Sequence, residues 1–175
     1  CSLPVPDFAE VTSEHQLHQV ISRLGLPLIC KTARSGYDGK GQWLIRQPSE
    51  IAQFEQILST PSSGVRWIAE QVVPFVRELS VLVVRSGNGK TRVYPVVENR
   101  HEQGILRDSV VPASISSRDA EAACELSVRA VAELHGVGIF CIELFQAQDG
   151  RLLINEIAPR PHNSGHYTID ACITN

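Results

Sequence analysis

The sequence has 175 residues, of which 43% are hydrophobic and 20% are charged, and its formal net charge is −3. This composition is typical of a globular protein with one sizeable core or two smaller ones. No apolar run approaches the roughly 18–20 residues of a membrane-spanning helix, and the mild acidity gives no general nucleic-acid footprint, so we expect neither partner.

The five cysteines, at positions 1, 30, 124, 141 and 172, are odd in number and include no Cys-x-x-Cys pair. Cys30 and Cys141 stand inside apolar runs, which is typical of buried reduced thiols. No signal peptide is visible, so this usage favours a cytoplasmic protein. The absence of methionine and the opening loop at 2–6 predict a piece excised from a longer protein.

Alternating helix and strand patterns predict a small α+β lobe over residues 1–75. Ser13 and Gln16 have capping-box spacing, and a helical apolar repeat then runs from Leu17 to Leu24 before Gly25. A second amphipathic helix is expected over 49–58. Strands are expected over 27–33, 42–46 and 65–73.

Residues 76–175 are expected to form a larger lobe, a mixed sheet with helices packed on it. Gly87-Asn88-Gly89 predicts a hairpin that joins strands over 78–85 and 90–97. An extended stretch over 104–111 precedes a long helix that begins at Ser116 or Ser117 and ends at His135. Apolar runs over 138–145 and 152–157 flank a turn at 148–151, which predicts a second hairpin.

Each run of this last hairpin carries one acidic residue, Glu143 in the first and Glu156 in the second. A buried carboxylate is costly unless a cation compensates it. Two carboxylates on paired strands, with Asn155 beside the second, suit the oxygen ligands that magnesium prefers. The alternative is a pair of strand-end carboxylates that reach solvent, and the pattern alone does not decide between these two interpretations.

The residues after Glu156 predict a loop rich in hydrogen-bond donors. Pro159 and Pro161 each remove a backbone donor, so the strand cannot continue regularly, and 163–165 has loop chemistry. Polar groups that could handle phosphate crowd this segment: Arg160, His162, Asn163, Ser164, Gly165 and His166.

A glycine-rich loop at 35–42 is the second candidate phosphate site. Its glycines would let backbone amides approach a phosphate, and Lys40 and the nearby Lys31 add positive charge. The spacing is not that of a P-loop, and a plain flexible turn is the alternative for the loop alone. Asp38 at its tip is either an acid/base group or a turn cap.

A candidate ligand-binding joint lies at Glu70–Val73, at the end of a strand just before Pro74. Joints between lobes commonly bind flat ligands through backbone groups, and Glu78 could accept hydrogen bonds from ribose hydroxyls. Both glutamates could equally be surface strand residues, and the lone His101 is ambiguous.

Four segments in order resemble the ATP-grasp enzymes of purine biosynthesis. They read KTARSGYDGKGQ, EQVVPFVRELSV, ENRHEQGIL and ELFQAQDGRLLINEIAPRPHNSGH, and the resemblance extends from Pro4 to Ala171. It implies an α+β ATP-grasp fold in which two lobes bind ATP between them, and it implies that flanking N- and C-terminal domains are missing here.

The resemblance also implies the site residues. Glu143 and Glu156 resemble the ligands of Mg2+ or Mn2+, although Ala158 stands where some members have an asparagine ligand. The catalytic set implied is Asp38, Tyr37, Lys31 and Arg160. The nucleotide-binding set implied is Lys31, Gly36, Tyr37, Asp38, Gly39, Lys40, Gly41, Gln42, Glu70, Gln71, Val72, Val73, Glu78, His101, Asn155 and Glu156.

The reaction that the resemblance implies is the ATP-dependent carboxylation of 5-aminoimidazole ribonucleotide by bicarbonate, through carboxyphosphate. The parent protein is then expected to be a homodimer, and the isolated piece to be inactive. Two alternatives are a formate-dependent glycinamide ribonucleotide transformylase, which shares the PRPH ending, and a non-catalytic nucleotide-binding module.

Overall fold

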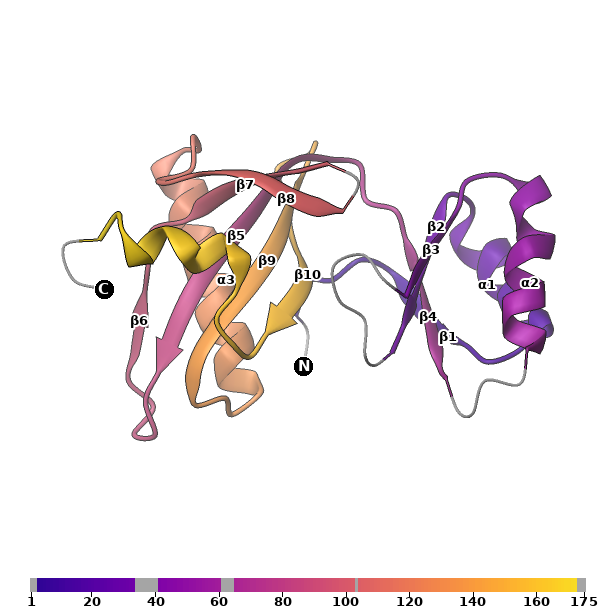
Figure 1. Ribbon diagram of the computed structural model, residues 1–175, viewed down its shortest axis with the longest axis horizontal. Coiled ribbons are helices and arrows are strands. Elements are labelled where there is room, and N and C mark those ends of the chain that lie inside the picture. The colour runs from indigo at the N-terminus through magenta and orange to yellow at the C-terminus, as the bar shows by residue number, and fades with distance from the viewer. Residues whose placement is uncertain (1–2, 34–40, 61–64, 103, 173–175) are drawn as a thin grey trace. The chain divides into compact units, whose positions relative to one another are not determined.

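The computed structural model describes residues 3–33, 41–60, 65–102 and 104–172 (Figure 1). The chain divides into two compact units. The N-terminal unit is Pro6–Val73, and the C-terminal unit is Cys1–Val5 together with Pro74–Asn175. The opening residues, expected in the first lobe, thus belong to the C-terminal unit, where the Ile154 amide donates to the carbonyl oxygen of Pro4 at 2.8 Å.

The N-terminal unit is a four-stranded antiparallel sheet with the order β1-β4-β2-β3 among the described residues. Its strands are β1 (Phe8–Val11), β2 (Leu28–Thr32), β3 (Gln42–Ile45) and β4 (Trp67–Gln71). Its helices are α1 (Glu14–Leu24), the 3-10 turn η1 (Pro48–Glu50) and α2 (Ile51–Ser59).

The capping and apolar spacing of α1 confirm the helix expected there. The Ser13 hydroxyl accepts a hydrogen bond from the Gln16 amide, and Gly25 ends the helix with a φ of 76° that favours glycine. The apolar stripe packs with α2 over one face of the sheet. Fully buried core residues of this unit include Val11, Leu17, Leu28, Cys30, Ile45, Phe54 and Ala69.

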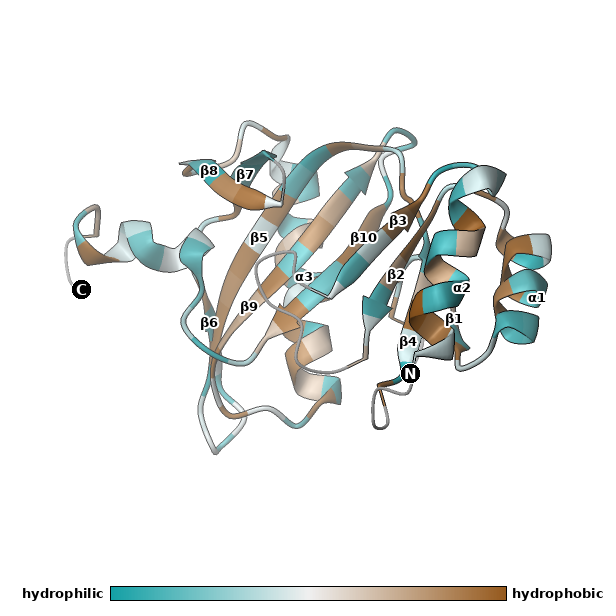
Figure 2. Cartoon of the chain, turned by 45° about the vertical axis from the view of Figure 1, so that its right-hand side comes forward, coloured by the Kyte–Doolittle hydropathy of each residue, from teal (hydrophilic) through white to brown (hydrophobic). Residues whose placement is uncertain are grey.

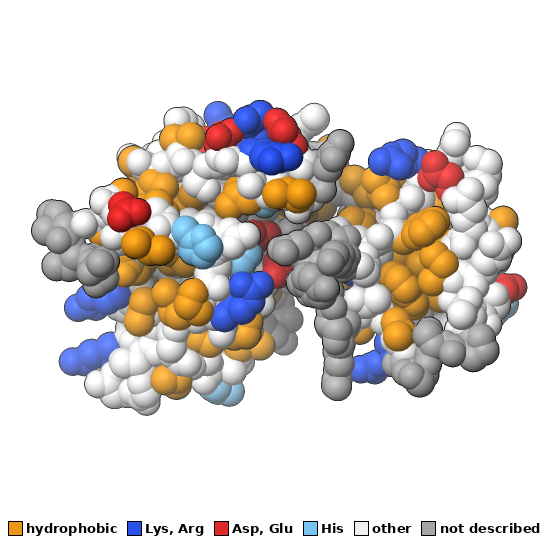
Figure 3. Space-filling model, in the orientation of Figure 1, with side chains coloured by type: hydrophobic (Ala, Val, Ile, Leu, Met, Phe, Trp, Pro, Cys, Tyr) orange, Lys and Arg blue, Asp and Glu red, His pale blue; other side chains and the backbone are white. Residues whose placement is uncertain are grey.

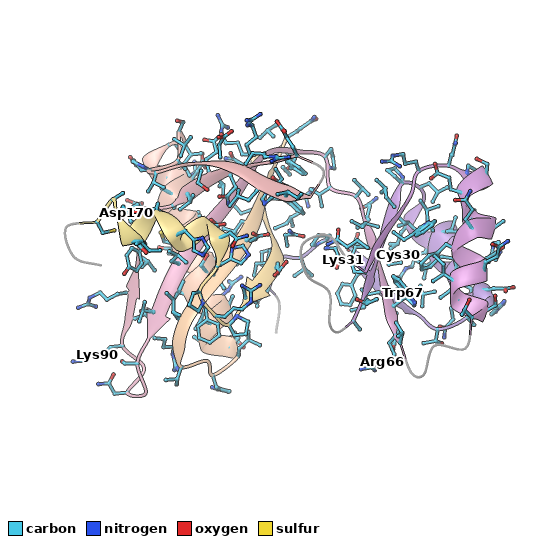
Figure 4. The ribbon with its side chains drawn as sticks, in the orientation of Figure 1. Cys30, Lys31, Arg66, Trp67, Lys90 and Asp170 are labelled. Carbon is cyan, nitrogen blue, oxygen red and sulfur yellow. The ribbon has the colours of Figure 1, made fainter. Side chains whose placement is uncertain are left out.

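Strand alternation divides the faces of this sheet. Cys30 is buried in the core, whereas its neighbour Lys31 belongs to the face away from α1 and α2, as Figure 4 shows. The buried side chains of β2 therefore anchor the strand on the face that α1 and α2 cover. Lys31 lies on the other face of the sheet, which we call the open face.

The C-terminal unit is built on a six-stranded sheet, counted over the described residues, with the order β10-β9-β5-β7-β8 and β6 paired to β5. The strands are β5 (Phe75–Arg85), β6 (Thr91–Val93), β7 (Val97–Glu102), β8 (Ile105–Val110), β9 (Gly138–Ala147) and β10 (Leu152–Ala158). The helix α3 (Ser117–Glu133) and the 3-10 helix η2 (Asn163–Ile169) complete the unit.

The core of the C-terminal unit lies between the sheet and α3, and η2 crosses the opposite face (Figure 1). Long apolar stretches run along β5 and β9 (Figure 2). Leu79, Val81 and Ile142 face α3 and are fully or almost fully buried. The alternate positions of the same strands, Glu78, Ser80 and Glu143 among them, lie on the η2 face, so that face is polar where the other is apolar.

Two expectations for this unit were wrong. The sheet is antiparallel at every described pairing rather than mixed: β5–β6, β7–β8 and β9–β10 pair with their neighbours in the chain, and the connection through α3 returns β9 antiparallel to β5. Residues 163–165 open η2 rather than a loop, because the His162 side chain accepts a hydrogen bond from the Ser164 amide and caps the helix.

A cluster of opposite charges covers the β7–β8 ribbon, at the top of the view in Figure 3. Arg100 pairs with Glu102 and Asp108, and Arg107 pairs with Glu102. These exposed pairs contribute little stability, but they place charge on an edge strand, which discourages edge-to-edge association. Among the described residues, no helix is long and apolar enough to cross a membrane.

Candidate active site

The two acidic residues of the last hairpin lie directly opposite each other. Glu156 on β10 pairs in register with Glu143 on β9, and the ladder shifts between Ile154 and Glu156. The shift leaves Asn155 as an extra residue, and such a bulge redirects side chains that a regular strand would alternate. The Asn155 amide nitrogen accordingly donates to Glu143 Oε2 at 3.4 Å. The bulge thus gathers two carboxylates and an amide.

The carboxylate of Glu143 is poorly solvated, and its side chain is 14% exposed. Burial, and next the neighbouring Glu156 charge, raise the pKa of Glu143 to about 7. A cation between the two carboxylates would offset both causes. In the described part of the chain, no group of three or more His, Cys, Asp or Glu side chains could hold a metal. Two carboxylates and an amide oxygen nevertheless fit Mg2+, which keeps several waters and takes substrate phosphate oxygens.

His162 lies beside Glu143 and belongs to the donor-rich segment that the sequence indicated. Its Nε2 is 3.6 Å from Glu143 Oε1, and burial lowers the pKa of the imidazole despite the nearby Glu156 charge. Arg160, two residues earlier, is exposed and donates to the carbonyl oxygen of Pro161 at 3.0 Å. The segment after β10 therefore places an imidazole beside Glu143 and the Arg160 guanidinium two residues away in the chain.

Glu78 and His101, separate candidates in the sequence, form a pair on neighbouring strands. Glu78 Oε2 is 2.5 Å from His101 Nδ1, and both side chains are about a quarter exposed, at 23% and 22%. The hydrogen bond to Glu78 outweighs burial and raises the pKa of His101, and the Glu143 charge acts in the same direction. The predicted ribose acid thus has an imidazole partner, and the pair extends the polar face from β9 to β7.

Sequence reasoning missed a buried polar layer in the same face. Asn99 Nδ2 donates to Ser80 Oγ at 2.9 Å, and the Ser109 hydroxyl donates to Asn99 Oδ1 at 3.0 Å. Ser80 is opposite Glu143 in the strand register and is completely buried. The available signal was the alternation itself, because Glu78 and Ser80 are polar at positions two apart within an apolar strand.

In the N-terminal unit, Lys31 and Glu70 form an ion pair on the open face of the sheet. Lys31 Nζ is 2.7 Å from Glu70 Oε2, and the side chains are 22% and 18% exposed. Lys31 also pairs in register with Gln42, which follows the glycine loop. Glu70 was predicted only through its place in the joint, whereas the structure shows its carboxylate holding the candidate phosphate lysine.

Of the remaining joint residues, Gln71 ends β4, and Val72 and Val73 follow the strand. The Gln71 amide donates to the Asp7 carbonyl at 2.9 Å, and the Val72 amide donates to the Pro27 carbonyl at 3.3 Å, while Val73 is half-buried. Gly41 has a φ of 78°, and a Cβ there would lie 2.7 Å from Thr32 Oγ1, so the end of the glycine loop requires glycine. The predicted residues Gly36, Tyr37, Asp38, Gly39 and Lys40 lie outside the described residues.

A shallow hollow of about 850 Å3 lies along α3, away from the carboxylate pair. Three arginines line it, and three acidic residues do so as well: Arg118, Arg129, Arg151, Asp119, Glu125 and Asp149. Because these charges balance, the hollow offers no net attraction for a phosphate, and it does not compete with the polar face as a nucleotide site.

Comparisons with known proteins identify the family of this fold. The sequence model of the ATP-grasp domain matches residues 1–175. The N5-carboxyaminoimidazole ribonucleotide synthase of Bacillus subtilis is 45% identical over 170 residues, which cover 97% of this chain and 44% of that protein. The chain therefore spans less than half of the length of this curated relative.

Solved structures of the same group have a similar fold. A crystal structure of N5-carboxyaminoimidazole ribonucleotide synthetase in complex with ADP superimposes with a TM-score of 0.90 at 42% identity, covering 98% of this chain and 45% of that one. The Aspergillus clavatus synthase in complex with ADP and 5-aminoimidazole ribonucleotide gives a TM-score of 0.84 at 31% identity, covering 96% and 43%.

Proposed function

The chain belongs to the ATP-grasp family, and on that premise we propose that its parent protein carboxylates 5-aminoimidazole ribonucleotide with bicarbonate and ATP. The observation that carries this proposal is the pair Glu143 and Glu156, which lie opposite each other on β9 and β10. Asn155, the extra residue of the bulge on β10, donates a hydrogen bond to Glu143. The names of the similar proteins supply the substrate class, since they are N5-carboxyaminoimidazole ribonucleotide synthases.

In the proposed reaction, a bicarbonate oxygen attacks the γ-phosphorus of ATP, ADP leaves, and carboxyphosphate forms. The exocyclic amine of the ribonucleotide then bonds to the carboxyl carbon, and inorganic phosphate leaves as the amine loses a proton. Catalysis of phosphoryl transfer depends mainly on positioning and on charge stabilisation. We assign the proton transfer to Asp38, with Tyr37 and Arg160 positioning the reactants.

The residues of the C-terminal unit would hold the polyphosphate end of the nucleotide. Glu143 and Glu156, with Asn155 beside them, would supply oxygen ligands for Mg2+, which would neutralise phosphate charge and act as a Lewis acid when bound. Glu78 and His101 offer an acceptor for ribose hydroxyls and a donor for a phosphate oxygen. Burial of Glu143, and next its repulsion with Glu156, makes the ionised Glu143 carboxylate unfavourable when no cation is bound.

The N-terminal unit would hold the base and the phosphates from its open face. Lys31 Nζ is held by Glu70 at 2.7 Å, so its side chain does not have to be ordered by the nucleotide. The segment Glu70–Val73 supplies the backbone groups for adenine, and the loop Gly36–Gln42 would cover the phosphates and exclude water from carboxyphosphate.

Glu156→Gln in the full-length protein tests the metal assignment. Removing one ligand charge loses several kcal/mol of transition-state stabilisation, so ATP turnover should fall on the order of 100-fold or more. Glu121→Gln, an exposed glutamate on α3, is the matched control and should retain full turnover. Equal turnover of the two variants would contradict the proposed metal site.

The substrates are tested by phosphate release from ATP in the same protein. Bicarbonate with 5-aminoimidazole ribonucleotide should stimulate release, whereas formate with glycinamide ribonucleotide should not. Asp38→Asn should reduce carboxylation more than bicarbonate-dependent ATP hydrolysis. Stimulation by neither pair would leave the non-catalytic nucleotide-binding module as the function.

The proposal extends to assembly and location. The family resemblance implies that the parent is a homodimer in the cytoplasm, and the buried free thiols Cys30 and Cys141 agree with a reducing compartment. Sedimentation velocity of the full-length protein tests the dimer, and a monomer at micromolar concentration would contradict it.

A further inference from the structure

The imidazole of His162 is held by the start of η2. The Ser164 backbone amide donates to His162 Nδ1 at 3.4 Å, and the Ser164 hydroxyl oxygen lies 3.2 Å from the same nitrogen. A ring nitrogen that accepts a backbone N–H must present its lone pair and therefore carries no proton. In a neutral imidazole the proton is then on Nε2.

The position of Ser164 is itself fixed by packing. Ser164 is 1% exposed, and the next residue, Gly165, lies so close to β5 that an added Cβ would be 2.9 Å from Leu82 Cδ1. The first turn of η2 is therefore pressed against the sheet. The Ser164 amide, which donates to His162 Nδ1, therefore cannot turn away unless the first turn of η2 loses its contact with Leu82.

The opposite edge of the same imidazole faces the metal-ligand candidate. His162 Nε2 is 3.6 Å from Glu143 Oε1, and the two side chains are 13% and 14% exposed. At this distance the contact is electrostatic rather than a direct hydrogen bond. A neutral N–H dipole stabilises the carboxylate without adding a second positive charge next to a cation.

We propose that Ser164 locks His162 as the Nε2–H tautomer, and that His162 is a positioning residue that orients the Glu143 carboxylate. Asn155 Nδ2 donates to Glu143 Oε2 at 3.4 Å, while His162 Nε2 lies 3.6 Å from Oε1, so a polar nitrogen faces each oxygen of the carboxylate. This arrangement fixes the carboxylate plane and leaves other lone pairs for a cation, as partners of metal ligands generally do. The value of this orientation for metal binding rests on the proposed function, whereas the tautomer does not.

The tautomer is measured by long-range proton–nitrogen NMR correlation on the chain labelled with 15N-histidine. His162→Gln identifies the His162 signals, and the exposed His166 of the same helix is the internal control. We expect a protonated Nε2 and an unprotonated Nδ1 for His162, with averaged nitrogen shifts for His166. A protonated Nδ1, or averaged shifts like those of His166, would overturn the proposal.

Two variants test the two contacts of the ring separately. Ser164→Ala keeps the backbone donor, so the Nε2–H tautomer should persist; its loss would show that the amide does not hold the ring. Glu143→Gln should shift the His162 Nε2 resonance and leave that of His166 unchanged. An unchanged Nε2 resonance in a folded variant would show that the Nε2–H group does not face the Glu143 carboxylate.

These outcomes are independent of catalysis. The expected tautomer and the expected response to Glu143→Gln, in a parent protein that turns over no ATP, would support the orientation of Glu143 and refute the proposed function. Full carboxylase activity with an averaged His162 tautomer would do the reverse.

Discussion

Glu143→Gln should stabilise the C-terminal unit when no divalent cation is present. The pKa of Glu143 rises from its ordinary value of 4.5 to about 7, chiefly through burial and then through the Glu156 charge. At about 1.4 kcal/mol per pKa unit, this difference corresponds to a free-energy cost of about 3 kcal/mol for the ionised form above pH 7. Because glutamine loses some hydrogen bonding to Asn155, we expect a net gain of about 1–3 kcal/mol.

The gain should depend on pH with a definite sign. Between pH 4.5 and about 7, the folded protein retains the Glu143 proton that the unfolded chain has lost. The folded state therefore binds more protons, and the free energy of unfolding of the wild type falls as pH rises through this window. The difference in the free energy of unfolding between Glu143→Gln and the wild type should be small near pH 4, increase between pH 5 and 7, and stay constant at higher pH.

Hydrogen exchange of the β9 backbone amides, followed by NMR in a chelating buffer, measures this difference within the correct unit. Tryptophan fluorescence would not serve, because Trp43 and Trp67 both belong to the N-terminal unit. Glu156→Gln, at an exposed position, is the matched control and should give a smaller gain. A difference that is absent, or equal at pH 4.5 and pH 8, would refute the reasoning. Millimolar Mg2+ should stabilise the wild type and not Glu143→Gln.

Three further predictions concern the packing of η2, the core of the N-terminal unit and the Glu78–His101 pair. Gly165→Ala should destabilise the C-terminal unit by about 1–3 kcal/mol, because the new Cβ meets Leu82, and Leu82→Ala should partly rescue it in β9 hydrogen exchange. Phe54→Ala should cost the N-terminal unit about 3–5 kcal/mol, since the ring is fully buried and contacts both tryptophans, whose fluorescence reports the loss. Glu78→Gln should lower the pKa of His101, measured by NMR titration, because the hydrogen bond to Glu78 is the largest cause that raises it; an unchanged titration would contradict the pairing.

The sequence was sufficient for the elements whose signals are local. Ser13 with Gly25, and Ser116 at the other long helix, mark helix ends through groups that bond within four residues. The turn at 148–151 predicted the last hairpin, and with it the placement of Glu143 and Glu156 on paired strands, because a short turn leaves the two strands few registers. The family resemblance then named the same carboxylates.

The register details were decided only by the tertiary structure. Three hydrogen bonds of the site connect residues that are 12 to 23 positions apart in the chain. They join Asn155 to Glu143, Asn99 to Ser80, and His101 to Glu78. The capping of His162 on η2 also escaped prediction, because the helix forms where Gly165 can approach Leu82 on another strand. Local pattern encodes which face of a strand is buried, whereas the partners on that face depend on how separate strands are shifted against each other, and that shift is set by packing of the whole sheet.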